Sequence, residues 1–198
     1  AKTHPDKRHK GISAFLVPRD VPGLSVIRDE DLMGLRGSPT TELEFDNVRL
    51  PADHLIGQEG EGFRIAMIAL DEARLNCAAM ALGAGTAALN DAVNYAKERV
   101  QFDKPIIEHQ GLQFKLAEMT AQMAAARSLW EESIAMLEAG QSKRSSAYAA
   151  LTKYVCTEAA MKVTIDAVQV LGGSGLSKAH SVERYMRDVK AFQIFDGT

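Results

Sequence analysis

The sequence predicts a mainly α-helical protein with a small antiparallel β part near its N-terminal end. Two observations predict this class. Residues 11–50 contain short alternating or β-branched stretches separated by glycines and prolines, as is typical of strands and turns. From about residue 60, apolar residues recur at intervals of three, four and seven, as is typical of helices. Because the helices are long and their connections short, they are expected to pack as an up-and-down four-helix bundle.

The composition excludes several functional classes. The chain has 198 residues, of which 46% are hydrophobic and 25% charged, and its net charge is −3. This acidic balance argues against a general nucleic-acid-binding protein, and no apolar run is long enough to span a membrane. Cys77 and Cys156 lie far apart and match no disulfide or metal-ligand spacing. We therefore expect reduced thiols and no metal site.

The β part is expected to contain three strands. Residues 11–19 mix β-branched and aromatic side chains, residues 24–28 form a second candidate, and residues 41–50 begin with an alternation. Residues 1–10 are basic and contain Pro5, which favours a solvated loop. We divide the chain into a partial middle β domain at residues 1–55 and a helical domain at residues 56–198.

The first helix is predicted to run from about residue 60 to residue 99. Gly83 and Gly85 lie inside it and suggest close approach of another helix. The apolar stripe that predicts this helix repeats every seven residues: Ile68, Leu75, Leu82, Leu89 and Ala96.

Three further helices are predicted. The second runs from about residue 108 to a C-terminal glycine at Gly140, the third from about residue 145 to residue 171, and the fourth over residues 182–192. Their apolar stripes comprise Leu112, Leu116, Met119, Met123, Trp130 and Leu137; Ala147, Leu151, Tyr154, Val155, Met161, Ile165 and Val168; and Val182, Tyr185, Met186, Val189 and Phe192.

The residues after the fourth helix contain a candidate catalytic acid. Asp196 directly follows Ile194 and Phe195 and precedes Gly197. A carboxylate partly withdrawn from water is a stronger base. The same residues also fit an ordinary turn, in which Asp commonly precedes Gly. Both interpretations are open on these residues alone.

Six segments, in this order, resemble the acyl-CoA dehydrogenase family, and together they cover nearly the whole chain. No single segment would suffice, but their common order makes coincidence an unsatisfactory explanation. The segments are GISAFLVP (11–18), GLRGSPTTELEFDNVRLP (34–51), GQEGEGFRIAM (57–67), YAKERVQFDKPIIEHQ (95–110), QVLGGSG (169–175) and VERYMRDVKAFQIFDGT (182–198).

The resemblance implies a reaction and a catalytic base. In this family a carboxylate removes the α-proton of an acyl-CoA thioester while FAD accepts the β-hydride, which gives a trans-2-enoyl-CoA. The residue before Gly-Thr is usually a Glu base, and here it is Asp196, whose carboxylate is retracted by roughly 1.5 Å. Some members carry the base on the first long helix instead. Ala73 occupies that position here, and Glu72 is one residue out of phase.

The resemblance also implies ligand contacts. Asp71, Arg74 and Gly197 match positions at the substrate, although Arg74 alone would fit an exposed or helix-paired arginine. Arg99 suits a pyrophosphate, although a helix C-terminus also favours arginine. Gly172 and Gly173 equally fit a simple helix stop. The positions that match FAD contacts are Arg99, Phe102, Gln110, Gln169, Gly172, Gly173 and Thr198.

The family subunit has further segments before and after this stretch, so we expect a fragment that does not turn over substrate alone. An electron-transfer flavoprotein as acceptor, a homodimer or homotetramer, and a bacterial cytoplasmic or mitochondrial matrix location are implied by the resemblance. Two alternatives stay open. One is a related flavoprotein with an Asp base, either a nitroalkane oxidase or a cyclic acyl-CoA dehydrogenase. The other is a helical oligomerisation module without catalysis.

Overall fold

The structure is a computed structural model that describes residues 1–140 and 142–197, without the side chains of residues 142–144. The chain forms two compact units. The first comprises Ala1–Leu32 and Arg36–Leu70, and the second comprises Met33–Leu35 and Asp71–Thr198. Long helices dominate, with a few short antiparallel strands, so the predicted fold class is confirmed.

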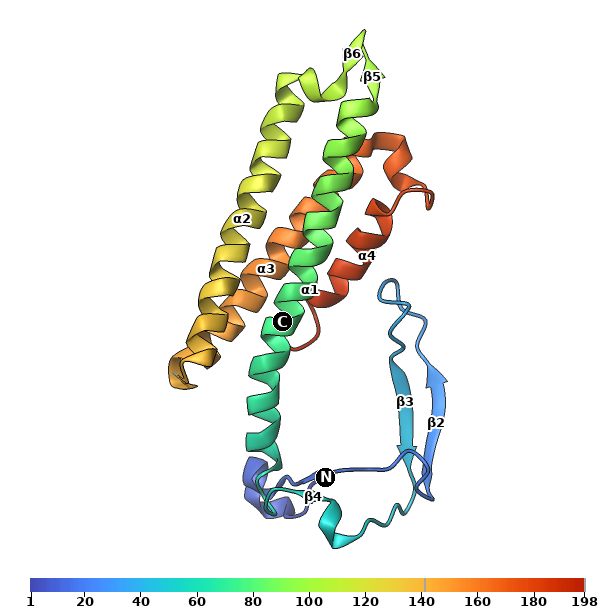
Figure 1. Ribbon diagram of the computed structural model, residues 1–198. Coiled ribbons are helices and arrows are strands. Elements are labelled where there is room, and N and C mark those ends of the chain that lie inside the picture. Colours follow the sequence, from blue (N-terminus) through green and yellow to red (C-terminus); the bar gives the residue numbers. More distant parts are fainter. Residues whose placement is uncertain (141, 198) are drawn as a thin grey trace. The chain divides into compact units, whose positions relative to one another are not determined.

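The first unit contains two antiparallel strand pairs. β2 (Leu24–Asp29) pairs with β3 (Thr41–Phe45), as Figure 1 shows, and a bulge interrupts their register after Val26. β1 (Ala14–Phe15) pairs with β4 (Leu55–Ile56), so the predicted strand over residues 11–19 is much shorter than expected and β4 was missed. Further backbone hydrogen bonds lie beside this short ladder; for example, Leu16 N donates to His54 O.

Short 3-10 helices occupy segments that were expected to be irregular. One covers Pro5–Gly11, where the sequence predicted a solvated loop. Its N-terminal proline suits the first helical turn, because proline lacks the N–H that would be unpaired there. Others cover Ala52–His54, Ile106–Glu108 and Gly172–Leu176.

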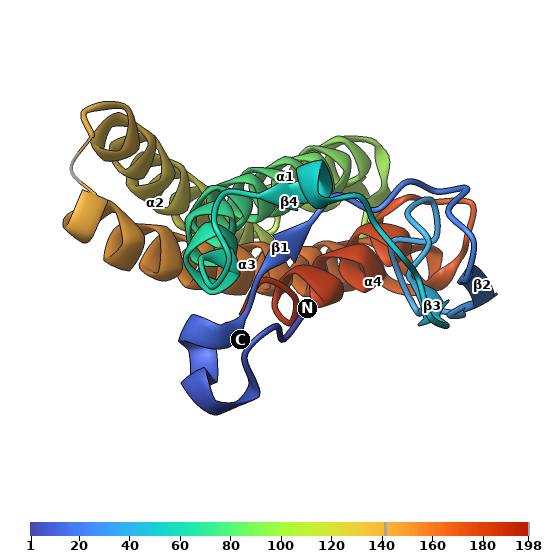
Figure 2. The same cartoon turned by 90° about the horizontal axis from the view of Figure 1, so that it is seen from below.

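The helical elements follow in an up-and-down order. They are α1 (Gly62–Glu98), α2 (Gln110–Glu138), α3 (Ser142–Leu171) and α4 (Val182–Phe192). A tight hairpin of β5 (Val100–Gln101) and β6 (Lys104–Pro105) joins α1 to α2. Figures 1 and 2 both show α3 beside α2 and α4. As predicted, Gly140 ends α2 in the left-handed conformation, with φ +70°.

The stripe predicted on α1 is buried over most of its length. Leu75, Leu82, Leu89 and Ala96 belong to the core, whereas Ile68 is 53% exposed. Ile68 lies in the first compact unit, before the part of α1 that packs in the bundle. Only the part of the stripe from Leu75 onward therefore marks the face of α1 that packs in the bundle.

The two glycines of α1 differ. At Gly85 an added Cβ would lie 2.9 Å from the Met123 side chain and 3.2 Å from Ala160 Cα, so this glycine permits close packing as predicted. At Gly83 no atom lies within 4 Å of an added Cβ among the described residues, so the same expectation was wrong there.

α3 presents only part of the predicted face to the core: Val155, Met161 and Val168 are partly buried and pack against core residues. Its large apolar residues Leu151, Tyr154 and Ile165 are exposed. The buried face consists mainly of small and polar residues: Ala149, Thr152, Lys153, Cys156, Thr157, Ala160, Val163, Thr164 and Ala167. Small side chains allow α3 to approach its neighbours closely, so the large residues lie on the opposite face. In contrast, Leu116, Met119 and Met123 of α2 are buried as predicted.

α4 is fixed on both its apolar and its polar side. Val182, Val189 and Phe192 are buried, which confirms the predicted face. On its polar side, Asp188 Oδ1 accepts a hydrogen bond from Leu35 N at 2.6 Å, and Arg187 Nη1 donates to Met33 O at 2.7 Å. α4 therefore has little freedom to shift, which matters for the residues that follow it. Over the described residues, no helix is long and apolar enough to cross a membrane.

Candidate active site

The candidate site begins where α4 ends, in a turn formed by residues 193–197. Gln193, the residue after α4, still has helical dihedral angles, and Asp196 and Gly197 adopt φ values of +57° and +105°. Asp tolerates the left-handed region better than most residues, and Gly enters it without steric penalty. The pair Asp-Gly therefore reverses the chain directly after the helix.

Two residues of α1 hold this turn. Arg74 Nε donates to the backbone carbonyl of Asp196 at 3.1 Å, and Arg74 Nη1 donates to Asp71 Oδ1 at 3.1 Å. The same Asp71 oxygen accepts a hydrogen bond from Ser146 Oγ at 3.0 Å. Both side chains of the ion pair are about three quarters buried. The structure thus brings together Asp71, Arg74, Asp196 and Gly197, the residues predicted for catalysis and substrate contact.

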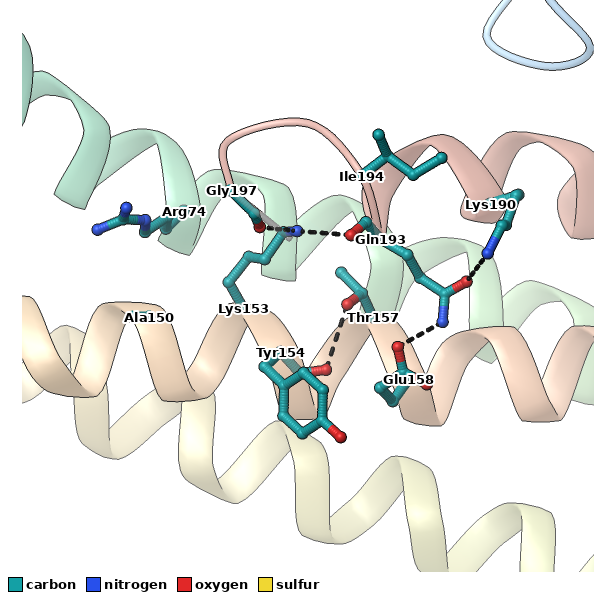
Figure 3. A pocket seen from close by; sticks show the side chains of 10 residues that line it. All are labelled: Arg74, Ala150, Lys153, Tyr154, Thr157, Glu158, Lys190, Gln193, Ile194 and Gly197. Atoms are coloured by element: carbon teal, nitrogen blue, oxygen red, sulfur yellow. Dashed lines mark hydrogen bonds between the residues drawn. The ribbon is translucent and has the colours of Figure 1, made fainter.

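A lysine from α3 holds the turn from another side. Lys153 is only 3% exposed. Its Nζ donates to Gln193 O at 3.1 Å and to Gly197 O at 2.5 Å, and Figure 3 shows it between these two carbonyls. Lys153 is not among the residues predicted from the sequence. Its spacing of three and seven residues from Cys156 and Ala160 could have indicated it, because this spacing places a charged residue on the same helix face as two small residues that are buried.

A pocket of about 330 Å³ lies beside the turn. Its lining includes polar groups that bond to one another: Lys190 Nζ donates to Gln193 Oε1, and Gln193 Nε2 donates to Glu158 Oε1 (Figure 3). The complete lining is Arg74, Ala150, Lys153, Tyr154, Thr157, Glu158, Lys190, Gln193, Ile194 and Gly197. The pocket thus adjoins the turn through Gly197, and Asp196 is not among the lining residues.

Asp196 is partly buried, and among the described residues its carboxylate takes part in no hydrogen bond or ion pair. It lies close enough to Cys77 of α1 to affect that thiol. Burial raises the pKa of Cys77 to about 11; the positive charge of Lys153 opposes the rise and Asp196 adds to it. Glu72 of α1 is exposed. Within the part of the chain that the structure describes, no donor engages the side-chain oxygens of Asp196.

A second cleft, of about 350 Å³, contains several of the residues predicted to contact FAD. Arg99, Gly172 and Gly173 line it together, although they are about 70 residues apart in the sequence. The guanidinium of Arg99 is exposed and forms no ion pair within the described part of the chain. Added Cβ atoms at both glycines would meet nothing within 4 Å, so this wall is open backbone. Tyr95 and Ser174, which were not predicted, line the cleft and share a hydrogen bond of 3.2 Å.

Three other predicted residues do not line this cleft. Phe102 is 88% exposed in the β5–β6 turn, where its φ is +55°, and its ring packs edge-on against His109. Gln110 and Gln169 are exposed on α2 and α3. Thr198 lies outside the described residues. Among the described residues, no cluster of three His, Cys, Asp or Glu side chains is placed to hold a metal ion.

Comparison with known families explains this combination of bundle and turn. The sequence model of the acyl-CoA dehydrogenase C-terminal domain matches residues 60–198, and that of the middle domain matches residues 1–48. The chain therefore belongs to the acyl-CoA dehydrogenase family.

Individual relatives agree with this assignment. A cyclohex-1-ene-1-carbonyl-CoA dehydrogenase of Geobacter metallireducens is 46% identical over all of this chain and 52% of its own length. Butyryl-CoA dehydrogenase from Megasphaera elsdenii superposes with a TM-score of 0.97 at 45% identity, over all of this chain and 51% of that one. A structure described as an electron transferring flavoprotein of Acidaminococcus fermentans superposes with a TM-score of 0.97 at 43% identity. The match covers 100% of this chain and 52% of that one. The chain spans about half the length of the relatives it matches.

Proposed function

We propose that the protein carrying this chain oxidises an acyl-CoA thioester between its α and β carbons to a trans-2-enoyl-CoA. The observation that supports this most directly is Asp196 itself: it is partly buried, its carboxylate has no partner among the described residues, and its turn is held by Arg74 and Lys153. It occupies the position at which this family usually has its base. When bound, FAD supplies the acceptor for the β-hydride.

Asp196 is proposed to remove the α-proton. A general base must be ionised, within reach of the proton, and not already engaged by another donor. Among the described residues nothing donates to its carboxylate, whereas its backbone carbonyl is bound by Arg74. The backbone is thus held and the reactive oxygens are left free.

Asp71, Arg74 and Gly197 are proposed to contact the substrate. Arg74 uses Nε and Nη1 within the protein, so that Nη2 is left for a ligand. An atom added at Gly197 would lie 3.6 Å from Nη2, so a glycine here leaves room beside the guanidinium. Their hydrogen bonds to each other and to the turn are what supports a substrate site beside Asp196.

The cleft lined by Arg99 suits part of FAD. An arginine guanidinium binds phosphate groups well, and exposed glycine backbone at Gly172 and Gly173 lets a ligand approach closely. We propose that Phe102, Gln110, Gln169 and Thr198 also contact the cofactor. Their separation from the cleft fits a cofactor that extends beyond it.

A second candidate function is the oxidation of a cyclic acyl-CoA thioester. Asp in place of the usual Glu retracts the carboxylate by roughly 1.5 Å, which suits a bulkier substrate carbon skeleton. Relatives at 46% and 43% identity are cyclohex-1-ene-1-carbonyl-CoA dehydrogenases. A nitroalkane oxidase, and a helical module without catalysis, are the remaining alternatives.

An electron-transfer flavoprotein is the proposed acceptor of the electrons. A homodimer or homotetramer is also proposed, because α3 exposes Leu151, Tyr154 and Ile165 on one face. The named relatives are bacterial, which supports a cytoplasmic location for this protein.

The test is anaerobic bleaching of the flavin in the full-length protein. Butyryl-CoA and cyclohex-1-ene-1-carbonyl-CoA are compared with each other, and nitroethane with oxygen is assayed separately. We expect bleaching by one thioester and none by nitroethane. Asp196→Asn should slow it by about 1,000-fold, because general-base catalysis is lost. A colourless protein that takes up no FAD, or an Asp196→Asn variant that bleaches normally, would refute the proposal.

A further inference from the structure

Lys153 has a function in the site that burial and packing alone do not explain. Lysine is almost never fully buried unless its charge is paired, yet Lys153 is 3% exposed. Within the described residues it forms no ion pair; its ammonium group instead donates to the backbone carbonyls of Gln193 and Gly197. The charge of Lys153 thus interacts with the backbone of the turn at residues 193–197.

These two carbonyls lie on either side of the catalytic acid. Gln193 is three residues before Asp196 and Gly197 is one residue after it, so a single ammonium group connects the two ends of the turn (Figure 3). Of the carbonyls between these two, that of Asp196 accepts a hydrogen bond from Arg74. The C-terminal end of a helix also carries partial negative charge, which favours cations here.

The turn needs such support because of its conformation. A φ of +57° is less favourable for Asp196 than a negative φ, although Asp tolerates it better than most residues with a side chain. An aspartate side chain has only two rotatable bonds, so the location of its carboxylate closely follows the backbone. Any relaxation of the turn therefore moves the base.

We propose that Lys153 is a positioning residue for Asp196: by holding Gln193 O and Gly197 O, it fixes the place from which the carboxylate removes the α-proton. The inference rests on the base function proposed above. Lys153 acts through the backbone and forms no hydrogen bond with the carboxylate, so it neither donates nor accepts the transferred proton. Its proximity to Asp196 is supported by the opposite effects of the two groups on the pKa of Cys77.

The test compares three variants of the flavin-loaded, full-length protein. Lys153→Met keeps the length of the side chain but removes its donors, and Lys153→Gln keeps one polar group in case the methionine variant does not fold. Lys162→Met is the matched control, because Lys162 lies on the same helix, is about half exposed and pairs with Glu118.

The rate of flavin bleaching should fall by about 100-fold in Lys153→Met, as expected for a displacement of about 1 Å. In Lys153→Gln the bleaching rate should fall by at least about tenfold. The isotope effect with an α-dideuterated thioester should rise, because proton removal becomes slower relative to other steps. Affinity for a non-reactive thioether analogue should stay within about twofold, since binding does not need the base in place. Lys162→Met should match the wild type.

A second readout does not require activity. Cys77 Sγ–H donates to Phe192 O next to the turn, and Cys77 is fully buried. Loosening the turn in Lys153→Met should speed iodoacetamide labelling of Cys77 by at least about tenfold, with the site assigned by mass spectrometry.

The outcomes separate the two proposals. If the wild type bleaches, Asp196→Asn does not, and both Lys153 variants bleach within threefold of wild type, only the positioning inference is refuted. If no thioester bleaches the wild type, the proposed function fails, and unchanged Cys77 labelling in Lys153→Met would additionally refute the positioning of the turn.

Discussion

The turn at residues 193–197 and the cleft beside Arg99 both lie at the ends of helices, yet they are built in opposite ways. Side chains from α1 and α3 bind three carbonyls of the turn: Arg74 binds one and Lys153 binds two. The cleft instead has an exposed arginine and a wall of glycine backbone.

This difference fits the two functions proposed above: the turn holds a catalytic base, and the cleft binds part of a cofactor. A base must lie within a fraction of an ångström of one proton, so its backbone has to be fixed before substrate arrives. A surface that holds part of a large ligand needs room and donors more than rigidity. Changes at the turn should therefore alter the rate, and changes at the cleft should alter affinity.

After the loss of the base in Asp196→Asn, the next largest effect is expected for Asp196→Glu. The longer side chain moves the carboxylate by roughly 1.5 Å, so flavin bleaching by the best thioester should fall by about 100-fold. Asp20→Glu, an exposed site with the same chemical change, is the control. Stopped-flow spectroscopy over the thioester panel measures both. A faster reaction in Asp196→Glu would mean that the reacting carbon lies where a Glu carboxylate reaches, which would contradict the cyclic-substrate candidate.

Arg74→Gln should slow bleaching by about 30-fold, because a hydrogen bond from a charged donor contributes about 2 kcal/mol. The control is Arg64→Gln, because Arg64 pairs with Glu61 at the same spacing as Arg74 with Asp71 but lies largely in solvent. Equal rates in the two variants would contradict the comparison between turn and cleft.

Arg99→Ala tests the cleft. Flavin affinity should weaken by about tenfold, or about 1.4 kcal/mol, while the bleaching rate at saturating FAD stays within threefold. Lys97→Ala, an exposed cation near the same helix end, is the control. Fluorescence titration of the apoprotein gives the affinity. A loss of rate without a loss of affinity would assign Arg99 to catalysis instead.

The smallest effect distinguishes two neighbouring glycines. Gly172 has φ +59°, so Gly172→Ala should destabilise the protein by about 1 kcal/mol, equivalent to a Tm lower by about 3 °C. Gly173 has neither a positive φ nor a nearby atom, so Gly173→Ala should leave the Tm unchanged. Differential scanning fluorimetry measures both. Equal Tm values would show that the backbone at Gly172 is not constrained.

Much of the helical part could be predicted from sequence, because the spacing of apolar residues along a helix indicates which of its faces is buried. The predicted bounds of α4 are those observed, and Leu116, Met119 and Met123 of α2 are buried as expected. The prediction was only partly right on α3: Val155, Met161 and Val168 pack against the core, but most of the fully buried residues of this helix are Ala, Thr and Cys. A pattern of large residues identifies the buried face only when the helices are far enough apart to need large side chains.

The site could be predicted only in part. Asp71, Arg74, Asp196 and Gly197 were recognised from their order in the sequence, and the structure brings them together. Lys153 was missed because its partners are backbone carbonyls, which have no sequence signature. Tyr95 and Ser174 were missed because their hydrogen bond joins elements far apart in the chain.

The neighbours Asp196 and Gly197 also affect how the catalytic test must be carried out. An Asn followed by Gly deamidates readily through a succinimide, because the glycine N–H can attack the side-chain amide without hindrance. The Asp196→Asn protein would therefore regenerate aspartate, together with isoaspartate, as it ages. Its residual activity should be measured on fresh protein and should rise on storage, and peptide mass analysis should show a matching gain of one mass unit.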